Sequence, residues 1–156
     1  MFKINLIAVG DIKEKYLKDA ISEYSKRISR FATISIIEIK EHIASSSSPK
    51  DIEIALEKDA LELMKKIKGY AICLDINGKE YTSIEYANYI KNLMLTNSEI
   101  SIIIGASNGI ANIVKEKCRD RISFSKMTFP HQLMRVIFLE QTYRAFTIIN
   151  NISYHK

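Results

Sequence analysis

The sequence has few of the residues that mark special classes of protein. Among 156 residues there is no tryptophan, and there are only two cysteines, two prolines and five glycines. Cys73 and Cys118 are far apart and form no CxxC pair, so neither a disulfide framework nor a zinc site is indicated. Cys73 lies within the apolar run AICLDI, which favours a buried, reduced thiol over a reactive nucleophile.

Long apolar runs are also missing. No stretch approaches the roughly 20 apolar residues that span a bilayer. The N-terminal MFKINLIAVGDIKEK has an apolar core too short for a secretory signal. We therefore expect a cytoplasmic protein with no membrane partner and no metal.

The remaining composition is that of an ordinary globular domain. Hydrophobic residues make up 47% of the chain and charged residues 26%, which excludes a largely disordered chain and a coiled-coil rod. At about 100–200 residues per domain, the chain forms one compact domain over residues 1–156.

The net charge of +5 is concentrated near the C-terminus. Residues 1–114 carry 15 basic and 15 acidic side chains, whereas residues 115–156 carry eight basic and three acidic ones. Basic side chains gain affinity for nucleic acids by displacing counterions from phosphates, so this asymmetry indicates a polyanionic partner. An incidental surface composition explains the charge equally well.

Hydrophobic periodicity predicts strands that alternate with helices. The predicted strands cover residues 3–10, 33–39, 71–76, 101–105 and 121–125, and the predicted helices cover residues 11–29, 51–68, 82–96, 110–118 and 130–150. We expect Asp51 to cap the second helix, Thr82 or Ser83 to cap the third, and Asn77-Gly78 to form a turn. The alternation is typical of an α/β fold, a mostly parallel sheet with helices on both faces.

The last predicted helix is apolar on more than one side. Between Leu133 and Ile149 apolar residues recur too often for a single stripe, so this helix must be buried on two sides. A second subunit would supply the additional burial, and we therefore expect a homodimer that pairs through this helix. A deep core within one chain is the alternative.

Ligands of α/β sheets bind at the carboxyl ends of the strands. The loop GASNG, residues 105–109, follows the fourth predicted strand, and its two glycines would let a ligand approach the backbone. The loop matches neither the dinucleotide motif GxGxxG nor the phosphate-binding motif GxxxxGK[ST]. An ordinary turn with a helix cap is at least as good an interpretation.

The segment FSKMTFPHQLMR, residues 124–135, mixes hydrogen-bond donors with large apolar side chains. Such a mixture is typical of a pocket for a ligand that is part ring and part polar. His131 and Arg135 lie four residues apart and share a helix face that could contact a phosphate or a base. A histidine at a helix start and an arginine in a salt bridge form the alternative. Glu140 and Arg144 have the spacing of a helix-stabilising ion pair.

The C-terminal NISYHK ends in Tyr154, His155 and Lys156. Tyrosine stacks on bases, histidine moves protons near neutral pH, and lysine binds phosphate. These three side chains therefore suit contact with a nucleic acid. A dispensable, frayed chain end is the alternative.

Several of these blocks resemble one known family. The N-terminal KINLIAVGDIKEKYLKDAISEY, the IIIGASNG loop, the block SFSKMTFPHQLMRVIFLEQTYRAF and the terminal YHK are similar to the RlmH (YbeA-type) methyltransferases of the SPOUT class. The resemblance covers essentially the whole chain and is most specific in SFSKMTFPHQLMR. It implies an S-adenosylmethionine-dependent enzyme that methylates ring nitrogen 3 of a pseudouridine in 23S, large-subunit, ribosomal RNA.

The resemblance also implies a C-terminal trefoil knot within the α/β fold and a homodimer that acts on the ribosome. Threaded chains are nearly absent from known folds, so periodicity by itself would not suggest the knot. By the same resemblance, the cofactor-binding residues would be Leu74, Gly105, Phe124, Ser125, Lys126, Met127, Thr128 and Phe129. The catalytic residues would be His155, Tyr154 and Arg135, while His131 and Arg144 would bind the RNA. Ala106 departs from the family, which commonly has a second glycine there.

For the reaction, we expect His155 and Tyr154 to position or deprotonate the target base while Arg135 or Arg144 binds phosphate. Two other functions remain open. A non-catalytic RNA-binding or ribosome-associated module would explain the basic C-terminal part without a cofactor. A nucleotide-dependent enzyme would use GASNG as a phosphate cradle, although the P-loop lysine and the ribose-binding fingerprint are missing.

Overall fold

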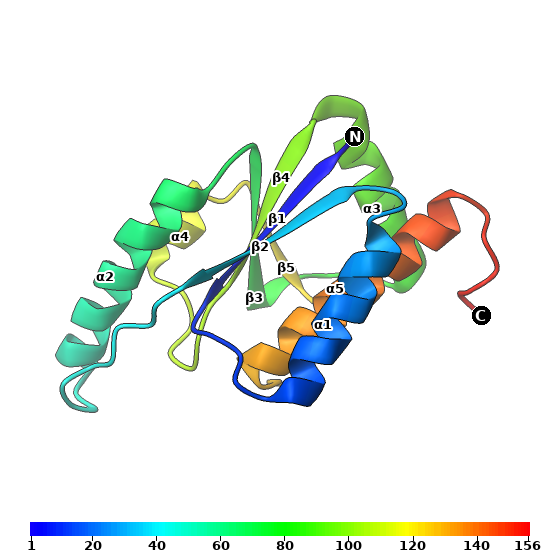
Figure 1. Cartoon of the computed structure of the whole chain (residues 1–156). Coiled ribbons are helices and arrows are strands. Elements are labelled where there is room, and N and C mark those ends of the chain that lie inside the picture. The colour runs from blue at the N-terminus through cyan, green and yellow to red at the C-terminus, as the bar shows by residue number, and fades with distance from the viewer.

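The chain folds into three layers, with a five-stranded sheet between two layers of helices (Figure 1). The structure, a computed structural model, describes all 156 residues. Along the chain the elements are β1 (Lys3–Val9), α1 (Lys15–Ile28), β2 (Thr33–Ile39), α2 (Pro49–Lys66), β3 (Tyr70–Glu80), α3 (Ser83–Thr96), β4 (Glu99–Ile104), α4 (Asn112–Lys117), β5 (Asp120–Ser123) and α5 (His131–Ile149). All strands are parallel, in the order β2-β1-β4-β3-β5, which confirms the predicted α/β fold.

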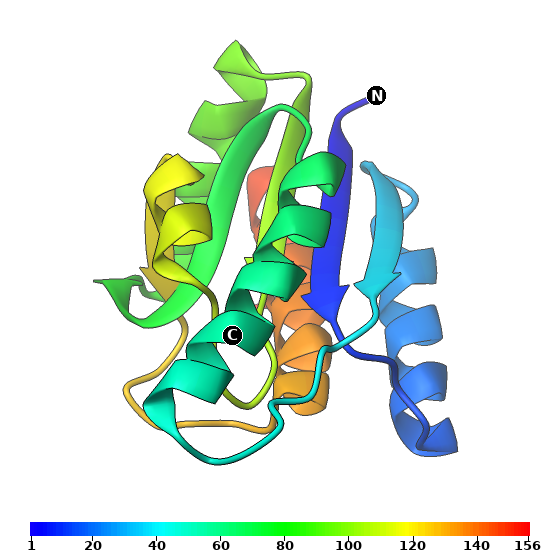
Figure 2. The ribbon, with the colours of Figure 1, turned by 90° about the vertical axis from the view of Figure 1, so that its left-hand side faces the viewer.

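Alternate residues of the central strands face opposite layers of helices. Leu6 of β1 and Ile102 of β4 pack with α1, α3 and α5, whereas Ile7 and Ile103 pack with α2 and α4. Figure 2 looks onto the layer of α2 and α4, with α1 and α5 behind the sheet. Because both faces are covered, the central strands are continuous apolar runs rather than alternating ones.

The predicted boundaries agree best where a local signal defines them. β2 begins and ends where predicted, and Thr82 with Glu85 forms the capping box of α3. The predicted cap of α2 was wrong, because Ser48 is the N-cap and its hydroxyl accepts a hydrogen bond from the Asp51 backbone N–H. Ser48 is the last of four consecutive serines, residues 45–48, so this serine tract has a structural role at the start of α2.

β3 is longer than predicted because its C-terminal part contains a bulge. Leu74 pairs with Ile122 of β5 and pairing resumes at Lys79, so the residues between them leave the regular ladder. Asn77-Gly78, predicted as a turn after the strand, lies within this irregular part of β3. The bulge therefore begins directly after Leu74, one of the predicted cofactor residues.

The connection from β4 to β5 crosses β3, which lies between these two strands in the sheet. α4 covers one face during this crossing, and after β5 the chain returns to the opposite face as α5. The trefoil knot implied for this part of the chain stays a prediction of the family resemblance.

α5 lies beside both α1 and α3 and packs on the sheet. Phe138 and Phe146 face this core and are each 1% exposed. Packing within one chain therefore accounts for much of the all-round apolar character of α5. Leu133 and Ile137 lie on its outer side at helical spacing, and Leu133 is 38% exposed. Homodimerisation through this helix stays a prediction.

The scarce residues of the sequence have ordinary places in the fold. Cys73 is free and buried, as predicted, and Cys118 is free and half-buried.

No helix is both long and apolar enough to cross a membrane. No group of three or more His, Cys, Asp and Glu side chains is arranged to hold a metal ion.

Candidate active site

The three segments predicted to bind a cofactor lie at one edge of the sheet. Because all strands are parallel, the loops that follow them open at the same edge, and β4, β3 and β5 are neighbours. Leu74 is the last residue of β3 before the bulge, Gly105 directly follows β4, and Ser125 lies in the loop after β5. The fold thus collects residues from three separate parts of the sequence.

The glycine loop after β4 is a tight turn. The Gly109 N–H donates to the Ala106 carbonyl oxygen at 2.9 Å. A Cβ atom on Gly105 would lie 2.5 Å from the Gly109 carbonyl oxygen, closer than any side chain tolerates. Gly109 has φ +80°, in the left-handed region that favours glycine. The turn itself therefore requires both glycines, and only at Gly109 does it leave the backbone open, with no atom within 4 Å of a Cβ position.

The loop after β5 is anchored at its first residue. Phe124 packs edge-on against Tyr86 of α3, with ring centroids 5.4 Å apart, and lies 6.2 Å from the ring of Phe138 on α5. These two contacts tie the start of the loop to both neighbouring helices. Phe124 is thus held in place by aromatic packing on both sides.

The rest of this loop is open to solvent. The Ser125 hydroxyl accepts a hydrogen bond from the Met127 backbone N–H at 2.9 Å and so stabilises a local turn. Met127 is 74% exposed, Lys126 and Thr128 are exposed, and Phe129 is exposed to an intermediate degree. An exposed methionine beside hydroxyl and ammonium groups is a surface suited to a ligand that is part apolar and part polar.

Asp75 is a residue of this edge that the sequence analysis missed. Its carboxylate lies 3.1 Å from Lys115 Nζ on α4 and accepts a hydrogen bond from the Asn77 N–H at 3.0 Å. Burial acts to raise the pKa of Asp75, but the Asn77 hydrogen bond and Lys115 outweigh it and hold the pKa below its usual value. Asp75 thus joins the start of the β3 bulge to α4. An acidic residue within the apolar run AICLDI was the available signal.

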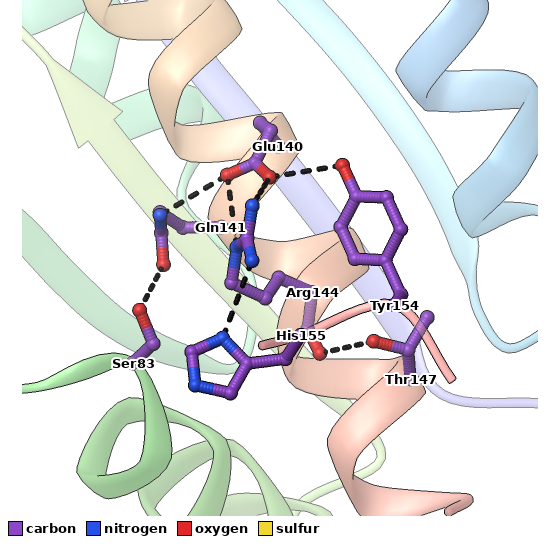
Figure 3. A network of polar contacts seen from close by, with 7 residues as sticks. All are labelled: Ser83, Glu140, Gln141, Arg144, Thr147, Tyr154 and His155. Carbon is purple, nitrogen blue, oxygen red and sulfur yellow. Dashed lines mark hydrogen bonds and ion pairs between the residues drawn. The ribbon is translucent and has the colours of Figure 1, made fainter. Parts of the chain in front are cut away.

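The C-terminal tail folds back along α5 (Figure 3). The Tyr154 hydroxyl donates to Glu140 Oε1 at 3.0 Å, and its ring stands edge-on to Tyr143 at 4.8 Å. Arg144 is ion-paired with Glu140, as predicted, and its guanidinium lies over the Tyr154 ring. It also donates to His155 Nδ1 at 3.2 Å. The predicted residues Tyr154, His155 and Arg144 are therefore brought together, and the tail is packed rather than frayed.

Two further residues join this network without any sequence signal. Gln141 donates from its amide to Glu140 at 3.0 Å and accepts a hydrogen bond from the Ser83 hydroxyl at 3.0 Å. Ser83 is the first residue of α3, which follows β3 (Figure 3). The tail network is thus connected through Gln141 to the start of a second helix.

The hydrogen bonds decide what Tyr154 and His155 can do chemically. Burial and the hydrogen bond to Glu140 raise the pKa of Tyr154 to about 12, so the phenol keeps its proton near neutral pH. A guanidinium only donates, so His155 Nδ1 accepts from Arg144 and the ring hydrogen lies on Nε2. In this tautomer His155 offers a ligand an N–H donor rather than a free base.

Arg135 is not placed where a phosphate contact was predicted. Its side chain is 1% exposed. Its guanidinium pairs with Glu38 at 3.0 Å and donates to the carbonyl oxygens of Val9 and Gly10 at 3.2 and 2.9 Å. Burial lowers the pKa of Arg135, although Glu38 opposes this effect. The alternative of an arginine in a salt bridge therefore describes this residue, which joins α5 to the ends of β1 and β2.

His131 shares a helix face with Arg135, as predicted, and lies at the first position of α5. It lines a hollow at the ends of β1 and β2 together with Gly10, Lys13 and Glu41. Partial burial, followed by the positive charge of Arg135, lowers the pKa of His131. The imidazole is therefore largely neutral at pH 7 and available as a polar contact near the loop after β5.

The loop after β5, which is predicted to bind the cofactor, and the tail network lie at different positions along the axis of α5. The loop after β5 runs into Pro130 at the start of this helix, whereas the tail contacts Glu140 and Arg144. At roughly 1.5 Å per residue, the ten residues from Pro130 to Glu140 span about 15 Å along the helix axis. In Figure 1 the C-terminus accordingly lies to the right, beyond the end of α5 farthest from this loop.

Comparison with known proteins places the chain in a family. Residues 2–155 match the model of a family described as "Predicted SPOUT methyltransferase". The chain belongs to this SPOUT methyltransferase family. The match includes the three loops and all but the last residue of the tail, so the resemblance inferred from the sequence blocks is confirmed.

Several relatives are similar over nearly their full length. The chain is 47% identical to "Ribosomal RNA large subunit methyltransferase H" of Fusobacterium nucleatum subsp. nucleatum and 48% identical to the protein of that name in Clostridium beijerinckii. It is 51% identical to "Putative ribosomal RNA large subunit methyltransferase H" of Methanococcus maripaludis. In each case the match covers 98% of this chain and 99% of the relative.

Two solved structures share the fold at low sequence identity. A probable methylase family protein from Haemophilus influenzae Rd KW20 superposes with a TM-score of 0.54 at 12% identity, over 99% of this chain and 70% of that one. A probable methyltransferase from Bordetella pertussis Tohama I superposes with a TM-score of 0.52 at 12% identity, over 92% and 96%. They show that the same α/β fold occurs in these two proteins.

Proposed function

We propose that this protein methylates ring nitrogen 3 of a pseudouridine in 23S ribosomal RNA with S-adenosylmethionine as methyl donor, and that it acts on the ribosome in the cytoplasm. The observation that carries the proposal is the match at 47–51% identity to relatives named as large-subunit ribosomal RNA methyltransferases. This match spans 98% of the chain and therefore includes every segment of the candidate site.

The residues at the carboxyl edge of the sheet fit the proposed cofactor. Gly105 allows the loop after β4 to close into a tight turn, and at Gly109, where no atom lies within 4 Å of a Cβ position, the loop backbone is open to a ligand. Leu74, Phe124, Met127 and Phe129 supply apolar surface, and Ser125, Lys126 and Thr128 supply hydrogen-bond donors. When bound, S-adenosylmethionine supplies the methyl group. The chain's contribution is to hold that donor in a fixed orientation toward the acceptor nitrogen.

The tail network suits the acceptor base. The imide N–H of a pseudouridine is weakly acidic, and attack on the methyl group requires this nitrogen to lose its proton, which passes to solvent water. The Arg144 guanidinium, although ion-paired with Glu140, lies where it would stabilise the negative charge that develops on the ring. His155 would donate from Nε2 to a base carbonyl oxygen, and the protonated Tyr154 would hold Arg144 in place by stacking. His155 is therefore assigned to positioning of the base rather than to its deprotonation.

The separation of loop and tail along α5 favours a site built from two chains. Donor and acceptor atoms must approach to about 3–3.5 Å before transfer, whereas the two clusters of one chain lie on the order of 15 Å apart along α5. The outer side of α5 carries Leu133 and Ile137 near the loop and Arg144 near the tail, on one helical stripe. Antiparallel pairing of two such stripes would place the tail of one subunit beside the loop of the other.

The decisive experiment compares ribosomal RNA from cells with and without this protein. Mass spectrometry of the nucleosides is expected to show a methylated pseudouridine that disappears when the protein is removed. If no methylated nucleoside is lost, the proposed activity is wrong. Calorimetry with S-adenosylmethionine distinguishes the methyltransferase from a non-catalytic RNA-binding module, because such a module would not bind the methyl donor.

A further inference from the structure

We infer that Arg135 is a positioning residue for the loop after β5, residues 124–129, which we propose to bind the methyl donor. It acts through a buried cluster of polar contacts, here called the Arg135 tie, that joins α5 to the ends of β1 and β2. The inference rests on the proposed function, because it assigns a role within the same site. It replaces the predicted phosphate contact, since a side chain that is 1% exposed does not reach RNA without rearrangement.

The tie joins three segments at one point. Arg135 donates to the carbonyl oxygens of Val9 and Gly10 at the end of β1. It also pairs with Glu38 of β2, and the same Glu38 oxygen accepts a hydrogen bond from the Ile12 N–H at 3.1 Å. One guanidinium therefore fixes the connection after β1, the end of β2 and the second turn of α5 relative to one another.

The start of α5 lacks the usual local stabilisation of a helix N-terminus, although Met134 packs against the core. Its N-cap residue is Pro130, whose side chain makes no capping hydrogen bond, and the first turn contains no acidic residue. Both features leave the first helical N–H groups without the usual stabilisation. The position of this turn therefore depends on tertiary contacts, and Arg135, five residues after Pro130, supplies the polar ones.

The orientation of the first turn bears directly on the preceding loop. The segment Ser125–Phe129 ends at Pro130, and its other end is held by Phe124 against Tyr86 and Phe138. Between these two ends the loop is mostly exposed, with the Ser125 to Met127 hydrogen bond as a local contact. Movement of the first turn of α5 would thus change the loop geometry. Burial of the Arg135 charge carries a desolvation penalty, so it is a poor means of stabilising the helix alone. Its presence is consistent with a requirement for one fixed orientation of the first turn of α5.

The test is substitution Arg135→Met, with steady-state kinetics and calorimetry on the full-length protein. We expect the KM and the dissociation constant for S-adenosylmethionine to rise about tenfold, while kcat at saturating donor and RNA changes less than about threefold. Arg135→Lys keeps a charge but not the fork of donors, and should recover part of the donor affinity. In the Glu38→Ala background, Arg135→Met should cost less than in the wild type.

The matched control is Phe146→Leu, which removes core packing from the far half of α5 without touching the tie. All measurements are made well below the lowest midpoint of thermal unfolding, which circular dichroism supplies. If Phe146→Leu raises the KM for the donor as much as Arg135→Met does, the effect is general destabilisation and the inference is wrong.

Two further outcomes would overturn the inference. If Arg135→Met binds the donor as tightly as the wild type does, Arg135 has no positioning role, and the proposed function is unaffected. A weaker RNA affinity with a smaller salt dependence would instead support a contact between Arg135 and an RNA phosphate. Each lost phosphate contact reduces the slope of log affinity against log salt concentration by about one. Failure of the wild type to bind S-adenosylmethionine would contradict the proposed function itself.

Discussion

Arg144 donates a hydrogen bond to His155 Nδ1 over 3.2 Å, and this contact decides which ring nitrogen of His155 carries the hydrogen. The two residues are 11 positions apart in the sequence, and the tail must fold back on α5 to bring them together. The contact turns a histidine suited to proton transfer into a hydrogen-bond donor at Nε2. It also keeps a positive charge beside the place proposed for the target base.

A donor role for His155 predicts a difference between two substitutions. His155→Gln retains an N–H donor and should lower kcat by about tenfold, whereas His155→Phe should lower it by about 10²–10³-fold. Single-turnover rates with saturating S-adenosylmethionine give the comparison. Equal losses in the two variants would indicate instead that His155 accepts the proton.

Removal of the positive charge in the tail network should affect catalysis more than donor binding. Arg144→Met is expected to lower kcat by about 10²–10³-fold, because the charge acts where negative charge develops on the ring. The dissociation constant for S-adenosylmethionine, from calorimetry, should stay within about twofold of wild type, since Arg144 is assigned to the acceptor base and not to the methyl donor. Donor binding reduced as strongly as kcat would contradict this division of the site.

The glycine loop should not tolerate a single added methyl group. Gly105→Ala places a Cβ 2.5 Å from the Gly109 carbonyl oxygen, and we expect a loss of about 1–3 kcal/mol in unfolding free energy. Donor affinity should fall as well, because the turn must open to accept the methyl group. Urea denaturation and calorimetry measure the two effects. The control is Ala106→Gly in the same loop, which adds no side-chain atom and should leave donor binding nearly unchanged.

The lowered pKa of His131 predicts a specific pH dependence of stability. Below its usual pKa of 6.5, the unfolded chain binds a proton at this position more readily than the folded chain, so stability falls as the pH falls. His131→Gln removes this contribution, and the decline in stability from pH 7 to pH 5 should become shallower. Urea denaturation across this range provides the measurement. Gln132→Ala, which removes no titratable group, should retain the wild-type slope.

A site shared between two chains predicts rescue in a mixture of two inactive proteins. One lacks Tyr154 to Lys156, and the other carries Gly105→Val, which blocks the donor loop. After the subunits are exchanged, half of the dimers contain one chain of each kind and one complete site, so about a quarter of wild-type activity should return. No rescue, with mixed dimers demonstrated by mass spectrometry, would place the complete site within one chain.

The pairing surface can be tested separately from activity. Leu133→Asp together with Ile137→Asp puts two charges on the outer stripe of α5, where they would oppose burial at an interface. Analytical ultracentrifugation should show a wild-type dimer and a largely monomeric variant. A variant that remains dimeric would move the interface to another surface.

Local sequence signals predicted individual elements well, because their causes act over a few residues. Thr82 and Glu85 start α3 through a capping box, and the apolar run of β2 gives its bounds without error. Ser48 was missed as the cap of α2 because four consecutive serines and Asp51 offer equivalent hydroxyl and carboxyl groups. The bulge in β3 was missed because it arises from pairing with β5, far along the chain.

The sequence by itself determined the α/β class, the loops that carry the candidate site, and the family, since each depends on local patterns or near-full-length similarity. Only the tertiary structure decided what Arg135 and His155 do. His131 and Arg135 lie on one helix face in any α-helix, but burial of Arg135 against Glu38 depends on where β2 ends. The tautomer of His155 likewise depends on a tail that folds back on Arg144. Periodicity defines which side of an element a residue occupies, whereas charge and protonation depend on the partner that packing brings to that side.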